Sequence, residues 1–299
     1  MKALIFHDIG DIRLEEVNPP KIKDLNDAII KITTSAICGT DLHFIRGIVG
    51  SMKKRTILGH EAVGIVEEIG KEVRNFKEGT RVIVPSTVAC GYCRLCRKGF
   101  YSQCDVANPN EPSAGTAFFG GPEASGPLQG YQAEYVRIPL ANNNLVILPD
   151  EVSDAKAILL LDIFLTAYFG AKEFKQELSE IASKSKPKDK NWIPGNAPSQ
   201  ALRIDTKLVS KCGTISIIGV YPSPSRGYPI GEAMNKNLKI VMGNCHHRAY
   251  IPHLLHKVQT GIVDPTKILT QIEPMTNIIE AYQQFDARET GWVKVALKV

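Results

Sequence analysis

Residues 38–61 read CGTDLHFIRGIVGSMKKRTILGHE, and the interpretation of the whole chain starts from this stretch. The stretch begins with the thiol of Cys38. It ends with the imidazole of His60 and the carboxylate of Glu61, which are adjacent in the sequence. Thiolate plus imidazole is a ligand mix that suits zinc, and a separation of about 20 residues is too long for a zinc finger, so an open catalytic site is favoured. Three more groups that can handle protons lie just after the cysteine: Thr40, Asp41 and His43. The plainer alternative is a buried free cysteine and an unrelated surface histidine.

The composition is that of a soluble globular protein. The 299 residues are 43% hydrophobic and 22% charged, enough for one large or two ordinary domains. The net charge of +5 is too mild and too scattered for a nucleic-acid-binding face. We expect no signal peptide from MKALIFHDIG and no apolar run long enough to span a membrane. Seven cysteines, an odd number, fit metal ligation in a reducing compartment, so we predict a cytoplasmic protein.

The first 150 residues predict a β-rich, barrel-like domain of short strands. Runs rich in β-branched residues alternate with polar, glycine- or proline-containing turns. The predicted strands are 1–6, 11–17, 27–37, 62–70, 80–86, 131–139 and 144–150.

The sequence pattern changes from strand-like to helical near residue 151, and the helical pattern covers 150–185. Ser153 or Asp154 can cap this helix and Gly170 interrupts it. An amphipathic stripe follows at Phe174, Leu178 and Ile181. A polar, proline-punctuated linker is predicted at 184–200.

The last hundred residues alternate between helices and strands. Two apolar runs, 213–221 and 238–244, are typical of a parallel sheet covered on both faces. Helices are predicted at 201–211, 248–261 and 276–287, and further strands at 267–274 and 292–299.

Four cysteines follow the spacing C-x2-C-x2-C-x7-C: Cys90, Cys93, Cys96 and Cys104. Two-residue spacing lets successive thiolates converge on one tetrahedral ion, and four ligands leave no open position, so a structural zinc site is predicted. An iron–sulfur cluster is a weaker alternative, because the ferredoxin-type run has three residues before its last cysteine and a proline after it. Four unrelated buried thiols are another alternative. A third is a zinc-ribbon nucleic-acid binder that uses Arg94, Arg97 and Lys98.

These motifs in this order resemble the zinc-containing medium-chain alcohol dehydrogenases. The resemblance rests on CGTDLH, GHEAVGIVEEIG, the four-cysteine segment and LLLDIFLTAYFGA, and resumes in GTISIIGVY and GEAMNKNLKIVMGNCHHRAYIPHLL. The branch that it resembles most is the formaldehyde dehydrogenase-like, glutathione-independent group. The implied fold class is α/β, with a GroES-like β-barrel catalytic domain and a Rossmann-like coenzyme domain.

The resemblance also implies site residues. Cys38 and His60 match the catalytic zinc ligands, and Asp162 matches the third ligand of the formaldehyde dehydrogenase-like branch. Thr40 matches the hydroxyl that takes the alcohol proton, His43 the next group in that relay, and Glu61 the acidic residue beside the metal. The four cysteines match the structural zinc lobe.

Asp162 has independent support, because it interrupts an apolar helical run and a buried carboxylate needs a cation or several donors. Its alternative is a carboxylate that reaches solvent at a helix edge. Cys212, Cys245, His246 and His247 match no ligand, so we expect core thiols and a surface histidine pair, although the pair could flank a cofactor site.

By this resemblance the chain holds two zinc ions and uses NAD to oxidise a small alcohol or aldehyde, without nucleic-acid or membrane partners. A homo-oligomer is also expected. The zinc would lower the pKa of the alcohol, and the nicotinamide would accept the hydride.

The coenzyme domain departs from the family pattern. We expect a catalytic domain at 1–150, completed by 264–299, and a truncated Rossmann-like domain at 151–263. Those 113 residues are too few for two βαβαβ halves, and the nine glycines after residue 150 never form G-x-G-x-x-G. We therefore expect the first mononucleotide-binding half to be deleted from this chain. Its loss predicts weak or no NAD binding and an exposed apolar edge near Ile215, Ile217 and Ile218. A catalytically silent zinc-binding scaffold is the alternative function.

Overall fold

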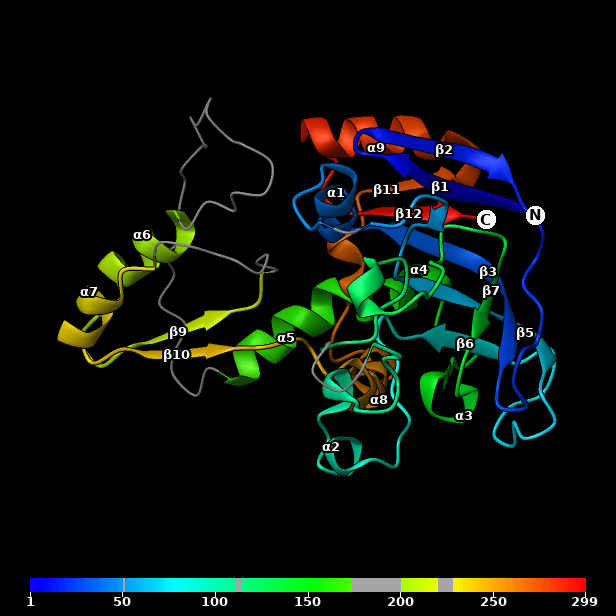
Figure 1. Cartoon of the computed structure of the whole chain (residues 1–299), viewed down its shortest axis with the longest axis horizontal. Helices are drawn as coiled ribbons and strands as arrows, with labels where there is room; N and C mark the ends of the chain where they lie inside the picture. The colour runs from blue at the N-terminus through cyan, green and yellow to red at the C-terminus, as the bar shows by residue number, and fades with distance from the viewer. Residues whose placement is uncertain (51, 111–114, 174–199, 220–227) are drawn as a thin grey trace.

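The computed structural model describes residues 1–50, 52–110, 115–173, 200–219 and 228–299. The expected stripe at Phe174, Leu178 and Ile181 and all but the last residue of the expected linker lie outside these ranges. The described part divides into a large β-rich body and a small outlying lobe (Figure 1).

A mixed, mostly antiparallel sheet forms the centre of the body. Its strand order is β11-β12-β3-β5-β6-β8, and β7 pairs with the N-terminal half of β3. The strands are β3 (Ala28–Ile37), β5 (Ala62–Ile69), β6 (Arg81–Val84), β7 (Tyr135–Ile138), β8 (Val146–Ile147), β11 (Gln271–Pro274) and β12 (Val295–Lys298). Most of β3 is buried, which explains why apolar and small residues fill most of its positions. The β-rich prediction for the first 150 residues is confirmed.

The two ends of the chain meet in this body. The C-terminal β12 runs antiparallel to β3, with Val295 opposite Ile37 and Lys298 opposite Thr34. A smaller sheet, β2-β1-β4, lies beside it: β1 (Lys2–Asp8), β2 (Asp11–Glu16) and β4 (Thr56–Ile57). Helix α9 (Ile278–Ala287) packs Ile278 and Tyr282 against Leu4 of this small sheet.

The segment after residue 150 differs from the single helix that the sequence predicted. It forms α4 (Asp154–Ala157), a 3₁₀ turn η4 (Ile158–Leu160) and α5 (Ile163–Glu173). The break falls at Leu161 and Asp162, so Asp162 precedes a helix and does not interrupt one. Helix α5 continues through Gly170, whose added Cβ would lie 2.8 Å from Cγ2 of Ile218. Gly170 therefore permits a close approach by the outlying lobe and does not end the helix.

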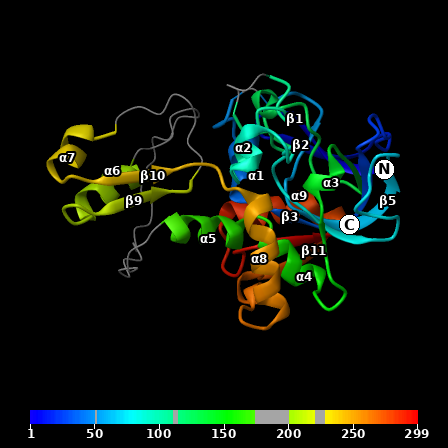
Figure 2. The same cartoon turned by 90° about the horizontal axis from the view of Figure 1, so that it is seen from below.

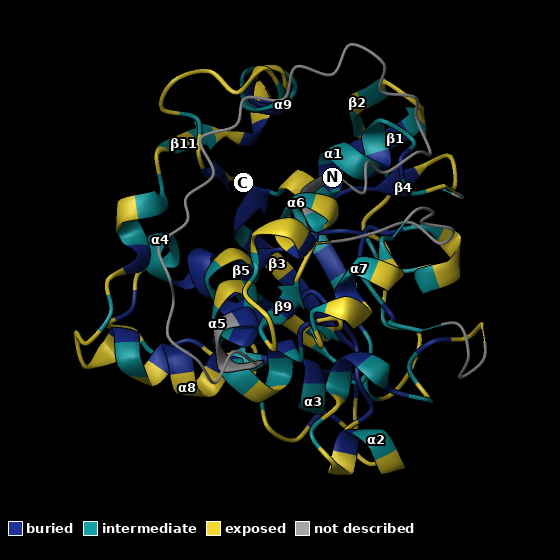
Figure 3. Cartoon of the chain, turned by 90° about the vertical axis from the view of Figure 1, so that its left-hand side faces the viewer, coloured by how far each residue is buried: buried dark blue, intermediate teal, exposed yellow. Residues whose placement is uncertain are grey.

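Helix α8 (His247–Gln259) is amphipathic as predicted. Ile251, Leu254, Leu255 and Val258 are buried, and they share a core with the apolar residues 157–161. Buried and exposed residues alternate along this helix in Figure 3.

The outlying lobe is built on two parallel strands, β9 (Thr214–Ile217) and β10 (Lys239–Met242), with α6 (Gln200–Leu208) and α7 (Ile230–Asn235). Figure 2 shows the lobe standing away from the body. Ile215 is buried, Ile217 is half-buried and Ile218 is 43% exposed. Of these three residues at the expected apolar edge, Ile218 is therefore the one that is exposed.

Short elements complete the described chain, and most of them were not predicted. They are α1 (Gly39–Ile45), α2 (Arg94–Arg97), α3 (Ala141–Asn144), η1 (Tyr101–Gln103), η3 (Glu123–Ser125), η5 (Pro265–Ile268) and η6 (Met275–Asn277). Among the helices in the described ranges, none is both long and apolar enough to cross a bilayer.

Candidate metal centres

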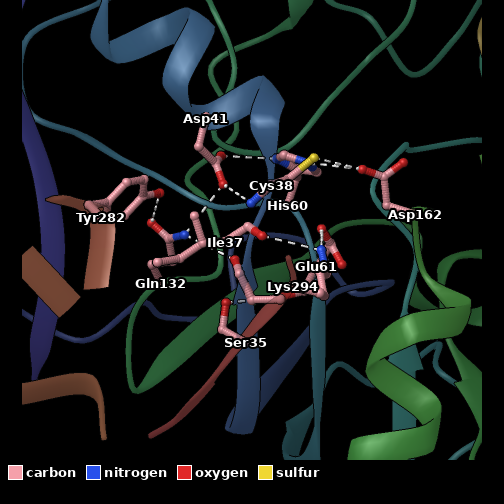
Figure 4. Close-up of polar contacts among 11 residues, drawn as sticks. Ser35, Ile37, Cys38, Asp41, His60, Glu61, Gln132, Asp162, Tyr282 and Lys294 are labelled. Atoms are coloured by element: carbon pink, nitrogen blue, oxygen red, sulfur yellow. Dashed lines mark hydrogen bonds and ion pairs between the residues drawn. The ribbon is translucent and has the colours of Figure 1, made fainter. Parts of the chain in front are cut away.

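The fold brings Cys38, His60, Glu61 and Asp162 together, and we call this group the Cys38 centre. One ligand atom from each residue lies within 4.8 Å of all the others. Cys38 Sγ is 3.0 Å from Asp162 Oδ2, and His60 Nε2 is 3.4 Å from the same oxygen (Figure 4). Cys38 follows β3 and caps α1, His60 precedes β5, and Asp162 precedes α5.

A glycine sets the backbone that delivers His60. Gly59 has a φ of 91°, in the region that favours glycine, and a Cβ there would lie 2.6 Å from Cγ of Gln132. The tight approach of Gln132 therefore requires glycine immediately before the imidazole.

Asp41 lies beside Nδ1 of His60, the ring nitrogen that does not face Asp162. It is fully buried, its Oδ1 lies 3.1 Å from His60 Nδ1, and its Oδ2 accepts the Cys38 backbone N–H at 3.0 Å. Gln132 reaches Asp41 at 3.5 Å and accepts a hydrogen bond from the Tyr282 hydroxyl at 2.9 Å. A carboxylate on the far nitrogen is the usual support of a metal-binding histidine, because it fixes the ring and its tautomer.

Lys294 forms a salt bridge with Glu61. Its Nζ donates to Glu61 Oε1 at 2.5 Å and to the Ile37 carbonyl at 3.3 Å, and both side chains are buried. Burial alone would lower the pKa of Lys294, but the charge of Glu61 raises it above its ordinary value, while burial raises the pKa of Glu61. Glu61 Oε2 has no hydrogen-bond partner in the described part of the chain and is free to face a cation.

The Cys38 centre concentrates opposing charges in a buried space. Burial, with a contribution from Asp162, raises the pKa of the Cys38 thiol to about 11. Burial would also raise the pKa of Asp162, but hydrogen bonding and charge from His60 lower it far below its ordinary value. Asp162 is therefore ionised, next to a thiol that a cation would have to deprotonate.

The residues of the Cys38 centre fit zinc. Tetrahedral sulfur, nitrogen and oxygen ligands at about 2.0–2.3 Å from the ion stand about 3.3–3.6 Å apart, close to the separations around Asp162 Oδ2. Thiolate, imidazole and carboxylate are all ordinary zinc donors, and three such ligands leave a position for substrate.

Thr40 and His43 lie on α1, three residues apart, and therefore on one side of the helix that begins at Cys38. The His43 Nδ1 atom is buried and has no hydrogen-bond partner in the described ranges. Burial, followed by the charge of Arg46, lowers the pKa of His43 below its ordinary value, which favours the neutral form of the ring.

The four-cysteine lobe, residues 90–104, has the geometry of a closed site. All four sulfurs lie within 4.8 Å of one another, with Cys90–Cys96 at 4.0 Å and Cys93–Cys104 at 3.9 Å. Sulfurs about 2.3 Å from a tetrahedral zinc would stand about 3.8 Å apart. Backbone N–H groups of Cys90, Cys93 and Cys96 point at neighbouring sulfurs, which stabilises thiolates.

The remaining cysteines and histidines differ from expectation in two places. Cys245 is buried as predicted, but Cys212 is exposed. His247 is 5% exposed, so the expected surface pair is wrong for this residue, because the start of α8 turns into the body.

Asp41 and Lys294 were not assigned from the sequence. Asp41 stands at the third position of a helix capped by Cys38, a local signal that could have found it. Lys294 lies 233 residues from Glu61, and an isolated lysine in a strand gives no such signal.

Comparisons with known proteins agree with this architecture. Residues 24–150 match the family model described as the alcohol dehydrogenase GroES-like domain. The chain is 29% identical to the zinc-type alcohol dehydrogenase-like protein AdhB of Bacillus subtilis, across all of both chains, and 30% identical to zinc-type alcohol dehydrogenase B of Aspergillus flavus, across 96% of this chain and 79% of that protein. The alcohol dehydrogenase TADH from Thermus sp. ATN1 superposes with a TM-score of 0.85 at 25% identity over all of both chains.

A GroES-like barrel that carries an open zinc-type centre, joined to a parallel-stranded lobe, defines an oxidoreductase of the alcohol dehydrogenase class. The chain belongs to the zinc-type alcohol dehydrogenase family of medium-chain dehydrogenases.

Proposed function

We propose that this chain is a zinc-dependent oxidoreductase that interconverts a short alcohol and its aldehyde at the Cys38 centre. The observation that carries the proposal is the convergence of Cys38, His60 and Asp162 in a buried space, with Asp41 behind the imidazole. A second zinc in the four-cysteine lobe would have a structural role, because its four thiolates leave no open position.

The residues of the Cys38 centre and those next to it have separate proposed roles. Cys38, His60 and Asp162 would hold the zinc, which when bound polarises the substrate oxygen and lowers the alcohol pKa. Thr40 would receive the alcohol proton and His43 would pass it toward solvent, since the Nδ1 atom of His43 has no hydrogen-bond partner in the described part of the chain. Lys294 would hold Glu61 in place beside the metal.

A formaldehyde-like substrate is part of the proposal. Its support is the glutathione-independent formaldehyde dehydrogenase of Pseudomonas aeruginosa, which is 34% identical over 180 residues that cover 57% of this chain and 44% of that protein. The hydride acceptor would be NAD, because the protein itself has no group that takes a hydride.

We also propose that the coenzyme unit, residues 151–263, is shortened and binds NAD weakly. The described part of this unit contains two parallel strands, whereas a dinucleotide fold is built from two βαβαβ halves. The alignment with AdhB spans 379 positions for a chain of 299 residues, so about 80 positions of that relative have no counterpart here. Both observations support a missing mononucleotide-binding half.

A zinc-binding scaffold without catalysis is the second candidate, and the presence of only two strands in the described part of the coenzyme unit favours it. Elemental analysis and turnover with formaldehyde or ethanol at about 10 mM NAD separate the candidates. We expect two zinc ions per chain and slow turnover. Two zinc ions without turnover would indicate the scaffold, and a single zinc that disappears with Cys104→Ser would remove the catalytic claim.

A further inference from the structure

A buried imidazole outside the proposed ligand set lies at the start of α8. His247 is 5% exposed, and its Nδ1 lies 3.5 Å from the Thr87 hydroxyl. Its Nε2 is buried and has no hydrogen-bond partner anywhere in the described part of the chain. A buried polar atom without a partner is costly, which points to a partner supplied by a ligand.

Two sets of contacts place His247 beside the Cys38 centre. Thr87 forms an antiparallel bridge with Phe118, and the Phe118 ring packs on the His60 ring with centroids 4.8 Å apart. On the other side, Cys245 Sγ lies 3.8 Å from the Leu165 carbonyl, in the first turn of α5 after Asp162. The loop that precedes α8 is thus held against the turn that carries the third ligand.

The Nε2 of His247, unpartnered among the described residues, limits which chemical groups of a ligand could bind there. An alkyl group would leave Nε2 without a partner. A hydroxyl suits either tautomer, because it can both donate and accept.

We propose that His247 is a specificity-determining residue whose Nε2 binds a second hydroxyl of the substrate, as in a 1,2-diol or a hydrated aldehyde. This inference rests on the proposed function, since it needs the first oxygen of the substrate at the Cys38 centre. Thr87 acts as a positioning residue that holds the Nδ1 side of the ring.

The test uses the full chain with cobalt in place of zinc and needs no coenzyme. Ethanethiol and 2-mercaptoethanol serve as probes, because the thiolate takes the place of the reacting oxygen and gives a cobalt charge-transfer band. Only 2-mercaptoethanol carries the second hydroxyl. We expect it to bind about five- to tenfold more tightly than ethanethiol, the effect of one buried hydrogen bond.

In His247→Phe this preference should fall to about one, with ethanethiol affinity unchanged. The matched control, His256→Phe on the exposed side of the same helix, should keep the preference. An undiminished preference in His247→Phe overturns the inference alone. No spectral change with either thiol overturns the proposed function as well.

A measurement on the unaltered zinc protein tests the same proposal if His247→Phe fails to fold. In ¹⁵N NMR spectra of the imidazoles, the chemical shift of His247 Nε2 should change on addition of 2-mercaptoethanol and should not change on addition of ethanethiol. Equal shifts with both probes would also overturn the assignment.

Discussion

We expect Asp162 to decide whether the Cys38 centre can hold a metal, because its carboxylate lies close to both Cys38 and His60. In Asp162→Asn the side chain keeps its size and loses its charge. We expect zinc affinity at this centre to fall at least about 100-fold, since even supporting groups outside the ligand set are worth about 10–100-fold. Elemental analysis after dialysis should show one zinc per chain. The control Asp264→Asn, at an exposed helix cap, should keep two.

Asp41 is expected to act through His60. Asp41→Asn keeps an oxygen for the Cys38 N–H but removes the charge facing His60 Nδ1. We predict about 10–100-fold weaker zinc binding at the Cys38 centre, measured by competition with a chelator, and no change at the four-cysteine lobe. Equal affinity at both centres would show that the imidazole is positioned without Asp41.

Lys294 should be important for stability. Lys294→Met leaves the buried Glu61 carboxylate without its ionic partner, which costs about 3–5 kcal/mol in comparable buried pairs. Urea unfolding of the zinc-free protein measures the loss. The double variant Lys294→Met with Glu61→Gln should recover much of it, because no unpaired charge remains. If the single variant is as stable as the parent, the pair is not ionic in solution.

At the scale of elements, we expect the four-cysteine lobe to depend on a metal ion for its structure. Residues 90–104 contain only one-turn helices, so thiolate ligation is expected to replace a hydrophobic core there. We predict that Cys104→Ser loses one zinc and melts at a lower temperature in calorimetry. Cys212→Ser, at an exposed thiol, is the matched control and should behave as the parent. Retention of both zinc ions in Cys104→Ser would contradict a structural zinc in this lobe.

The elements predicted best were the strands of the body and the amphipathic α8. Their periodicity reflects burial on one or both faces, a property that the local sequence carries. The break before α5 was predicted wrongly, because helix propensity alone cannot show that the Asp162 carboxylate is drawn toward His60 and Cys38. The position of His247 was missed for a similar reason, since two adjacent histidines resemble an exposed helix start.

For the whole molecule, the decisive quantity is the affinity for the coenzyme. We predict that NAD binds with a dissociation constant in the millimolar range, because the described coenzyme unit holds two strands and the sequence has no G-x-G-x-x-G turn after residue 150. Calorimetric titration of the zinc-loaded chain measures it. Micromolar binding would show that residues 151–263 form a working coenzyme site. A homo-oligomer stays a prediction.

The sequence by itself determined the four-cysteine lobe, the identities of Cys38, His60 and Asp162 as candidate ligands, and the β-rich body. Short spacing in a loop and alternation along a strand are local constraints. Only the tertiary structure decided the pairing of Glu61 with Lys294, the support of His60 by Asp41 and the burial of His247. These contacts depend on the closure of the sheet by β12 beside β3 and on the turn before α8, which bring together groups up to 233 residues apart.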